Sequence, residues 1–301
     1  MNIPKQQKFG RPRLLILGCG DVGMRLLPLL RARYRVFAVT TQPERLDELR
    51  AAGAIPVLAD LDRPGTLRRL AGLAHRVIHL APPQPDGALD RRTRHVTAIL
   101  PEGAQVVYVS TTGVYGDLQG ALADETQPVA PRNARAHRRV DAERTLRAWA
   151  RRAGGRVAIL RAPGIYAADR LPLARLHAGT PALVAEDDVY TNHIHADDLA
   201  AIVRRALYRA QPGRIYHAVD DTDIRMADYF DAVADAFRLP RPPRLPRAEL
   251  ARVVSPTLLS YMSESRRLAN DRVTRELGVR LQYPTVTDGL RAATAQDSAG
   301  N

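Results

Sequence analysis

Cysteine is nearly absent from this chain of 301 residues, in which Cys19 is the single example. One cysteine excludes an internal disulfide framework and is typical of a protein from a reducing compartment. Long hydrophobic runs are also absent. The strongest, residues 14–30, is interrupted by Asp21 and Arg25 and is followed by no small-residue cleavage site. We therefore expect a soluble cytoplasmic protein that does not engage a membrane.

Lysine and aromatic residues are scarce as well. Of the 45 basic residues only Lys5 and Lys8 are lysines, and aromatic residues make up 5% of the chain. A net charge of +13 would suit a nucleic-acid partner. The arginines, however, are spread through the expected helices, and few aromatic side chains are available to stack on bases. We interpret the arginine content as a compositional bias and expect a small-molecule substrate, with no nucleic-acid partner and no metal site.

Short apolar runs alternate with segments of helical periodicity along the first half of the chain. Strands are predicted at residues 14–18, 35–40, 55–60, 76–81, 105–110 and 156–160. Strict alternation of strand and helix is typical of right-handed crossovers in a doubly wound parallel sheet. The sequence therefore predicts an α/β protein of the Rossmann type.

The second half is richer in proline and has shorter elements. Helices are predicted at 196–208, 225–237 and 247–253, a strand at 214–219, and a stiff connector at 240–247. We expect four segments: a flexible tail at 1–11, a dinucleotide-binding domain at 12–165, a smaller substrate-binding lobe at 166–294 that shares the sheet, and a flexible tail at 295–301.

A glycine-rich turn follows the first predicted strand. Its sequence is Gly18-Cys19-Gly20-Asp21-Val22-Gly23, the pattern G-x-G-x-x-G at the start of a helix. The three glycines suit a tight turn, a close approach of backbone to pyrophosphate, and close packing of helix on strand. The helix N-terminus then offers free N–H groups to phosphate. We expect this turn, including Asp21 and Val22, to bind a dinucleotide.

The end of the second predicted strand bears on the choice of dinucleotide. An acidic residue there would hold the ribose 2′-hydroxyl of NAD, but the chain has Thr40, Thr41 and Arg45 instead. Two hydroxyls and a guanidinium suit a 2′-phosphate, so NADP(H) is favoured over NAD(H), although Arg45 also fits a solvated position in a first helical turn. Asp60 and Leu61, after the third strand, are placed to meet the adenine, and Asp60 could equally cap the next turn.

The fifth predicted strand runs into a cluster of hydroxyl groups and a glycine turn, YVSTTGVYGD at 108–117. With LGCGDVG, LRAPGIY (160–166), TNHIHADDLA (191–200) and RIYHAVDD (214–221), this motif resembles the short-chain dehydrogenase/reductase superfamily. The likeness is to the extended or atypical branch, the NAD-dependent epimerase/dehydratase-like proteins, and it covers nearly the whole chain.

The resemblance assigns roles to several residues. It implies that Thr111 is the catalytic hydroxyl and that residues on two further loops line the cofactor cleft, namely Leu80, Ala81, Pro82, Pro163 and Ile165. It also implies a Y-x-x-x-K motif on the helix at 133–150, in which tyrosine exchanges a proton and lysine assists it. Alignment on Ala142-Glu143 puts Arg135 at the tyrosine position and Arg139 at the lysine position.

The helical pattern of the same segment places Arg135, Arg138 and Arg139 on its inward face. We expect Arg139 to contact cofactor ribose or phosphate and Arg135 to hold an anionic group of the substrate, because guanidinium binds oxyanions well. His137 falls on the outward face.

A displaced proton donor is expected among the groups that the resemblance brings near the cleft. Tyr115 and Tyr166 are the candidate catalytic phenols, while Thr112 and His193 are expected to face substrate. Packing is the alternative role for the tyrosines, and a strand or cap position for His193 and His195. Asp197 and Asp198 open a helix and suit its dipole, which predicts a structural role.

Two functions remain open. The first is an oxidoreductase or epimerase for a nucleotide-sugar or other small polar substrate, with a non-standard active site. The second is a catalytically inactive NADP(H)-binding sensor or scaffold. A homodimer through the helix at 133–150 is possible, although Arg144, Arg147, Arg151 and Arg152 would repel a symmetric copy.

Overall fold

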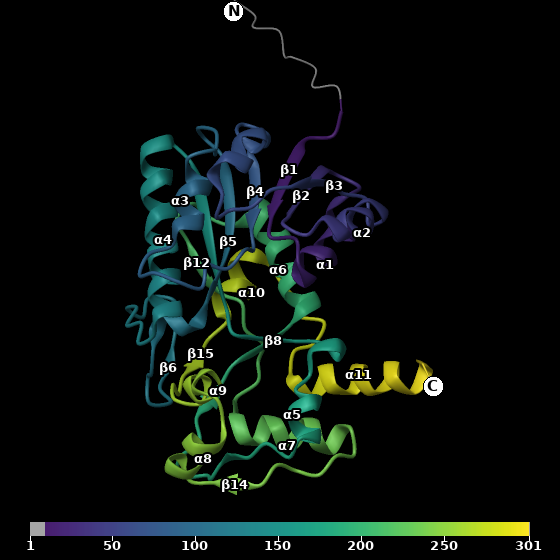
Figure 1. The fold of residues 1–301 in the computed structure, drawn as a ribbon, viewed down its shortest axis with the longest axis vertical. Helices are drawn as coiled ribbons and strands as arrows, with labels where there is room; N and C mark the ends of the chain where they lie inside the picture. The colour runs from purple at the N-terminus through teal and green to yellow at the C-terminus, as the bar shows by residue number, and fades with distance from the viewer. Residues whose placement is uncertain (1–9, 301) are drawn as a thin grey trace, which may run out of the picture.

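The computed structural model describes residues 10–300, so most of the tail expected at 1–11 lies outside the described residues. A seven-stranded sheet of order β12-β7-β5-β4-β1-β2-β3 forms its centre (Figure 1). All neighbouring strands are parallel. The strands are β1 (Arg13–Leu17), β2 (Arg35–Thr40), β3 (Ile55–Leu58), β4 (Arg76–His79), β5 (Gln105–Thr111), β7 (Arg156–Ala162) and β12 (Ile215–His217). The predicted Rossmann-type sheet is confirmed.

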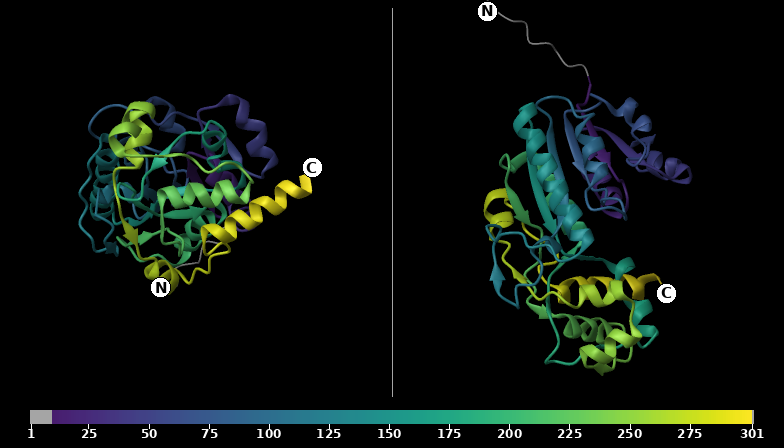
Figure 2. Two further views of the ribbon diagram at one scale, coloured as in Figure 1. Left: turned by 90° about the horizontal axis from the view of Figure 1, so that it is seen from below. Right: turned by 60° about the vertical axis from the view of Figure 1, so that its left-hand side comes forward.

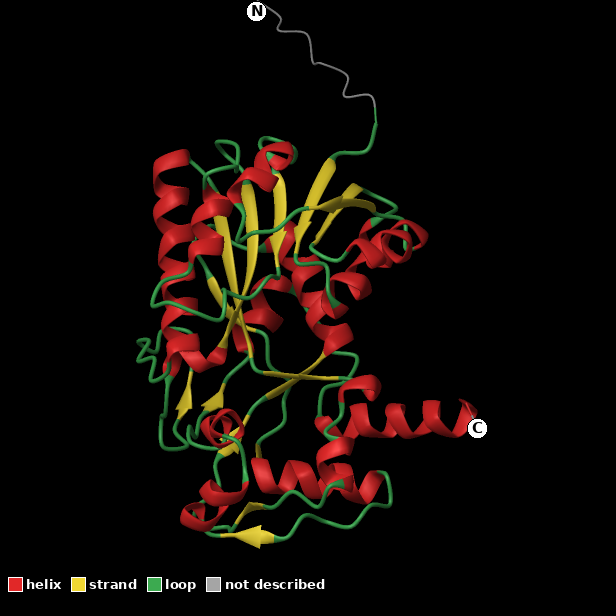
Figure 3. Cartoon of the chain, in the orientation of Figure 1, coloured by secondary structure: helices red, strands yellow, loops and turns green. Residues whose placement is uncertain are grey.

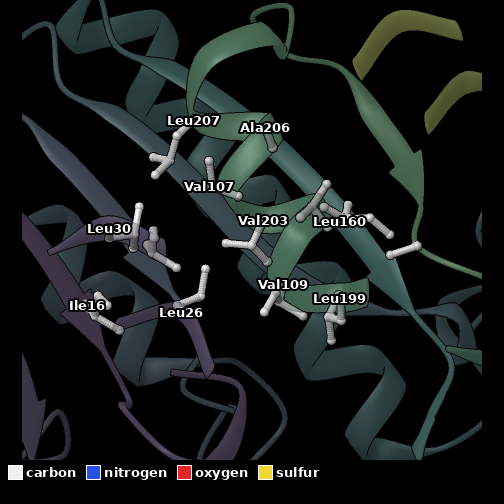
Figure 4. Packing of buried hydrophobic residues seen from close by; sticks show 14 of the residues in the cluster. Ile16, Leu26, Leu30, Val107, Val109, Leu160, Leu199, Val203, Ala206 and Leu207 are labelled. Carbon is white, nitrogen blue, oxygen red and sulfur yellow. The ribbon is translucent and has the colours of Figure 1, made fainter. Parts of the chain in front are cut away.

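Helices cover both faces of the sheet (Figure 3), which is why the strands read as continuous apolar runs. One face carries α1 (Asp21–Leu30), α6 (Ala196–Arg209) and α10 (Asp271–Leu277). The other carries α3 (Arg91–Thr97), α4 (Ala134–Ala153) and the 3-10 helix η2 (Pro64–Leu70). The 3-10 helix η1 (Pro43–Arg45) and α2 (Leu46–Ala51) connect β2 to β3. Figure 4 shows Leu26 of α1 and Val203 of α6 in one cluster with Ile16 and Val107 of the sheet.

A smaller lobe lies beyond the carboxyl ends of the strands (Figure 1). It contains η4 (Ala168–Arg170), α5 (Leu173–His177), α7 (Met226–Ala236), α8 (Arg247–Val253), α9 (Pro256–Tyr261) and α11 (Val286–Gly300). Its own apolar core includes Phe230, Val233, Leu250 and Leu290. α7 and α11 lie side by side in both views of Figure 2.

Four two-stranded sheets complete the fold. They pair β6 (Leu122–Ala123) with β15 (Arg267–Leu268), β8 (Gly164–Tyr166) with β11 (His193–His195), β9 (Ala182–Leu183) with β14 (Arg244–Leu245), and β10 (Tyr190–Thr191) with β13 (Ile224–Arg225). The structure describes no helix long and apolar enough to cross a bilayer within residues 10–300.

Segments of the second half return to the sheet. β12 pairs with β7 at the edge, and α6 packs against α1, so the lobe is not a continuous stretch of sequence. The connector expected at 240–247 contains β14, because Arg244 and Leu245 pair with β9. The end of the chain also differs from the expected tail at 295–301. Residues 295–300 continue α11, because a helix already anchored by the buried Val286 and Leu290 extends readily through alanine-rich sequence.

Candidate functional site

Two adjoining cavities lie at the carboxyl ends of the sheet strands. The first, of about 510 Å³, runs past the glycine-rich turn and the ends of β2, β4 and β5. The second, of about 440 Å³, lies between the sheet and the lobe. Thr111, Arg139, Pro163, Ile165 and Arg170 line both cavities. A ligand in the first cavity would therefore meet a ligand in the second at these residues.

The glycine-rich turn has the geometry that a pyrophosphate requires. Gly18 has φ +78°, and a Cβ there would lie 2.7 Å from the Cα of Ala81. A Cβ on Gly23 would lie 2.8 Å from the Sγ of Cys19 in the turn itself, so the turn leaves little room for a side chain at this position of α1. Gly20 differs, because a Cβ there would meet nothing within 4 Å and would project into open space. No side chain caps α1 at Gly20, which leaves its first N–H groups for an anion.

Every residue that the sequence assigns to the cofactor lines the first cavity, from Gly18 to Ile165. The carboxylate of Asp21 is paired with Arg25 and Arg170, at 2.9 and 2.8 Å. We therefore expect Asp21 to meet a phosphate through its backbone N–H. The residues present thus fit a dinucleotide.

The wall where adenosine is expected carries two arginines. Arg45 donates to the carbonyl oxygen of Cys19 at 2.7 Å and pairs with Glu48 at 2.8 Å. Arg92, which the sequence interpretation missed, pairs with Asp62 at 2.6 Å. The backbone N–H of Asp62 in turn donates to the carboxylate of Asp60 at 2.9 Å, so Asp60 stabilises a turn while it lines the cavity.

The hydroxyl cluster after β5 lies where the cavities meet. The Oγ1 of Thr111 accepts a hydrogen bond from the N–H of Gly113 at 3.2 Å. Thr112 opens the 3-10 helix η3 (Thr112–Tyr115) and lines the second cavity. Ser110 lines the first cavity, and its buried hydroxyl has no hydrogen-bond partner in the described structure. The pattern of hydroxyls identified this edge, but it did not single out Ser110.

The three arginines of α4 have separate environments. Arg138 is buried and donates to the carbonyl oxygen of Gly87 at 2.8 Å. Arg139 donates to the hydroxyl of Tyr108 at 3.0 Å and to the carbonyl oxygen of Val109 at 2.9 Å. His137 is exposed, as expected, but Arg135 is exposed as well, so the inward position predicted for Arg135 is wrong.

Arg135 reaches across the second cavity to a tyrosine of the lobe. Its guanidinium carbon lies 4.3 Å from the centroid of the Tyr261 ring, and it donates a hydrogen bond to the phenol oxygen. Both residues line the cavity, together with Thr111 and Thr112. The sequence interpretation missed Tyr261, because 126 residues separate it from Arg135 and no local motif marks it.

The two expected catalytic phenols lie outside both cavities. Tyr115 is fully buried, and its hydroxyl lies 2.5 Å from the Nε2 of His217. The guanidinium of Arg161 lies over its ring, 4.7 Å from the centroid, and pairs with the buried Glu143 at 2.7 Å. The structure therefore corrects the assignment of Tyr115, since this buried polar network turns its hydroxyl away from the cavities.

Tyr166 has a packing role as well. It is 2% exposed and donates to the carbonyl oxygen of Thr285 at 3.2 Å. Its ring meets the edges of His193 and His195, at centroid distances of 6.2 and 5.2 Å. This ring fills the base of the lobe and does not reach the space where a substrate would lie.

His193, another residue expected to face the substrate, is buried and lines the second cavity. It stacks on Tyr229, with ring centroids 4.1 Å apart, and its Nδ1 has no partner in the described structure. Burial lowers the pKa of His193 to about 3, so the ring is neutral. A neutral imidazole can position a polar group of a substrate by hydrogen bonding.

The acidic residues in the first turn of α6 fix this helix to its neighbours, which agrees with their predicted structural role. His195 caps α6 by accepting from the N–H of Asp197 at 3.2 Å. Asp197 pairs with Arg25 at 2.7 Å. Asp198 accepts from the N–H groups of Gln282 and Tyr283 at 2.7 and 2.9 Å. Both carboxylates are structural. Residues 10–300 contain no cluster of His, Cys, Asp and Glu suited to a metal ion.

The parallel sheet, the glycine-rich turn and the cleft together define a dinucleotide-binding protein of the short-chain dehydrogenase/reductase superfamily. The model of the NAD dependent epimerase/dehydratase family matches residues 14–219. The chain belongs to this family, and its resemblance to the extended branch is confirmed.

Solved structures of similar fold extend over nearly the whole chain. A functionally unknown conserved protein from Silicibacter pomeroyi is 30% identical, with a TM-score of 0.80, and the match covers 95% of this chain and 99% of that one. A UDP-glucose 4-epimerase from Thermotoga maritima is 15% identical, with a TM-score of 0.76 over 96% and 99% of the two chains. A dTDP-glucose 4,6-dehydratase from Streptomyces venezuelae, solved with NAD, is 20% identical, with a TM-score of 0.74 over 96% and 98%. The last two show likeness of fold alone. A search of curated proteins found no match.

Proposed function

We propose that this protein is an NADP(H)-dependent oxidoreductase or epimerase whose substrate is small, polar and anionic, as a nucleotide sugar is. The observation that carries the proposal is the contact between Arg135 and Tyr261 in a cavity that meets the cofactor cleft at Thr111. Because α4 contains no tyrosine, the phenol in this contact comes from the lobe.

The residues have distinct tasks in this proposal. A bound NADP(H) supplies or accepts the hydride. The hydroxyl of Thr111 donates a hydrogen bond to the reacting oxygen of the substrate, and the phenol of Tyr261 gives or takes the proton. The guanidinium of Arg135 stabilises the negative charge that develops on the phenol oxygen as the proton leaves.

The charge of the second cavity supports an anionic substrate. Four arginines line it, and Arg170 and Arg266 are paired with acids. Arg135 and Arg139 have no acidic partner among the described residues and can hold a carboxylate or phosphate. Tyr190 and Tyr229 line the same cavity.

The preference for NADP(H) rests on Arg45 and Arg92. Both line the first cavity, and Arg45 follows β2, at whose end no acidic side chain is present to hold the 2′-hydroxyl. Arg45 is already paired with Glu48, and Arg92 with Asp62. A bound 2′-phosphate would share each guanidinium with that acid.

An inactive dinucleotide sensor is the second candidate, and the environment of Arg139 favours it. The Nη1 of Arg139 is engaged by the hydroxyl of Tyr108 and the carbonyl oxygen of Val109, so this cation is held against the sheet. A lysine at this position would reach the ribose as a mobile ammonium group.

Binding and turnover separate the two candidates. NADPH and NADH are titrated by cofactor fluorescence, and the loaded protein is then offered nucleotide sugars and anionic carbonyl compounds, with oxidation followed by absorbance and epimerisation by NMR. We expect turnover that Thr111→Val and Tyr261→Phe each reduce by about 10²-fold or more, while Tyr208→Phe, on α6, retains it. Tight binding without turnover would leave the sensor as the function, and absence of dinucleotide binding would reject both candidates.

A further inference from the structure

Four strands of the central sheet begin with arginine, at the edge where the strands start. Arg35 opens β2, Arg13 opens β1, Arg76 opens β4 and Arg156 opens β7. Arg13 lies opposite Arg35, so these two share one face of the sheet. Arg76 lies opposite Leu14 and Gln105, and Arg156 lies opposite Gln105, so the second pair shares the other face. Neighbouring strands are about 4.8 Å apart, so the strand starts from β2 to β7 span about 19 Å. We call these four arginines, with Arg11 beside them, the basic edge.

The arginines of the basic edge have no acidic partner among the described residues. No ion pair joins any of them to a carboxylate in residues 10–300. Two of them rest on aromatic rings, Arg76 over Tyr34 at 5.5 Å and Arg35 over Phe37 at 5.6 Å. Their positive charge is therefore held in place and is not neutralised within the chain.

Helix ends add to this charge. In a doubly wound fold the helices run against the strands, so their last turns reach the edge where the strands begin. Arg31 and Arg33 follow α1, and Arg151 and Arg152 end α4. Arginine at a helix C-terminus offsets the helix dipole, which explains these side chains without a ligand. The arginines that open strands have no such explanation.

The basic edge is hollowed. One cavity, of about 640 Å³, is lined by Arg11, Arg13, Arg76 and Arg156. A second, of about 600 Å³, is lined by Arg11, Arg31 and Arg35. Since Arg11 lines both, the two hollows adjoin at this edge of the sheet. Figure 1 shows that the strands begin at the end of the molecule opposite the lobe, so this surface is separate from the cofactor cleft.

We propose that the basic edge binds the sugar-phosphate backbone of a single-stranded nucleic acid, without reading its sequence. Five guanidiniums without an acidic partner among the described residues gather around two adjoining hollows, and this charge complements a chain of phosphates. A flexible strand can follow hollows of this size, whereas a flat bilayer would touch only their rims. Aromatic side chains for base stacking are few, which predicts contacts to phosphate alone.

The sequence argued against nucleic acid on two grounds, the spread of the arginines through the expected helices and the scarcity of aromatic residues. The first ground does not apply to these four arginines, because each opens a different strand. In a parallel sheet all strands begin at the same edge, so the topology gathers them. The inference is independent of the catalytic function proposed above, since its residues belong to neither of the cavities at the carboxyl ends of the strands.

The test measures binding of a fluorescein-labelled oligouridylate to the full-length protein by anisotropy over a range of NaCl concentrations. Four phosphate contacts predict a slope of log K against log salt of about −3. The triple variant Arg13→Glu, Arg76→Glu and Arg156→Glu should bind at least about 50-fold more weakly at low salt. The matched control, with Arg63, Arg144 and Arg252 changed to Glu, alters the net charge equally and should bind within about threefold of the wild type.

Circular dichroism and NADPH titration check that the triple variant folds. If it does not, Arg13→Glu and Arg156→Glu are tested singly, and each should weaken binding by about tenfold. The proposal is overturned if the wild type does not bind the oligonucleotide, or if both triple variants lose affinity equally. It is also overturned if vesicles with phosphatidylserine bind through these arginines while the oligonucleotide does not.

Discussion

Arg135 lies over the ring of Tyr261 from the far side of the second cavity, with its guanidinium carbon 4.3 Å from the ring centroid. One residue belongs to α4, which packs on the sheet, and the other ends α9 in the lobe. The pair therefore ties the dinucleotide-binding part of the fold to the substrate-binding part. It also brings a phenol and a cation together in the cavity that Thr111 lines.

A double-mutant cycle tests whether this pair acts as a unit in catalysis. We expect Arg135→Gln and Tyr261→Phe each to lower kcat by about 10²-fold, and the double variant to be no slower than the slower single one. Arg135→Lys, which keeps the charge, should recover part of the rate. Independent, multiplicative losses in kcat would argue that Arg135 and Tyr261 do not cooperate.

Two glycines of the phosphate turn should respond differently to alanine. Gly18→Ala combines a positive φ with a contact of 2.7 Å to the backbone of Ala81, and we expect it to lower the free energy of unfolding by about 1–3 kcal/mol. Gly20→Ala has room within the protein, so its stability should change by less than about 0.5 kcal/mol. Its NADPH affinity should nevertheless fall at least about tenfold, because the new methyl group occupies the phosphate position. Urea unfolding and cofactor titration measure the two effects. An unchanged affinity in Gly20→Ala would contradict the assignment of this turn to phosphate.

Arg45 is expected to select the cofactor. Removing its guanidinium in Arg45→Ala should weaken NADPH binding by about tenfold and leave NADH binding nearly unchanged, since only NADPH carries the 2′-phosphate. Arg50→Ala, an exposed position on the adjoining helix α2, serves as the control. A ratio of the two affinities that does not change in Arg45→Ala would reject the NADP(H) preference.

Tyr115 should matter for stability and not for chemistry. Tyr115→Phe leaves the buried Nε2 of His217 without its partner, which should cost about 1–3 kcal/mol in urea unfolding. Tyr283→Phe, whose hydroxyl bond to Gln282 is exposed, should cost less than about 0.5 kcal/mol. A large fall in kcat for folded Tyr115→Phe would return this residue to the list of catalytic candidates.

Asp220 should make stability depend on pH. Burial raises the pKa of Asp220 to about 7, and one of its carboxylate oxygens has no hydrogen-bond partner in the described structure. The folded protein therefore binds this proton more tightly than the unfolded chain does. The stabilisation of the folded state by this bound proton is complete below the ordinary carboxyl pKa. It is lost as the pH rises to about 7.

Asp220→Asn removes this titration, so its advantage in unfolding free energy over the wild type should grow between about pH 4 and pH 7, by about 1.4 kcal/mol for each unit of pKa shift at most. The amide oxygen can still accept the bond from the N–H of Thr222 that Asp220 accepts at 3.0 Å. The exposed Asp228→Asn should follow the wild type at each pH. A constant difference between Asp220→Asn and the wild type would show that the buried carboxyl is not the source of the pH dependence.

The cofactor cleft was predictable because its signals are local. Gly18, Gly20 and Gly23 are dictated by one turn, and the strand ends that supply Thr40, Asp60 and Leu80 meet at one edge once the parallel sheet is recognised. The catalytic phenol was not predictable in the same way. Tyr115 follows a family motif, but a motif does not say that Arg161 and His217 will enclose its ring.

The amino-acid sequence by itself determined the strand and helix alternation, the phosphate turn and the absence of a phenol at Arg135. These depend on periodicity and backbone geometry over a few neighbouring residues. Only the tertiary structure decided that Tyr261 reaches Arg135 across 126 residues, and that arginines opening four separate strands form one basic edge. Both outcomes depend on which distant segments the packing of the core brings together, and no local pattern encodes that.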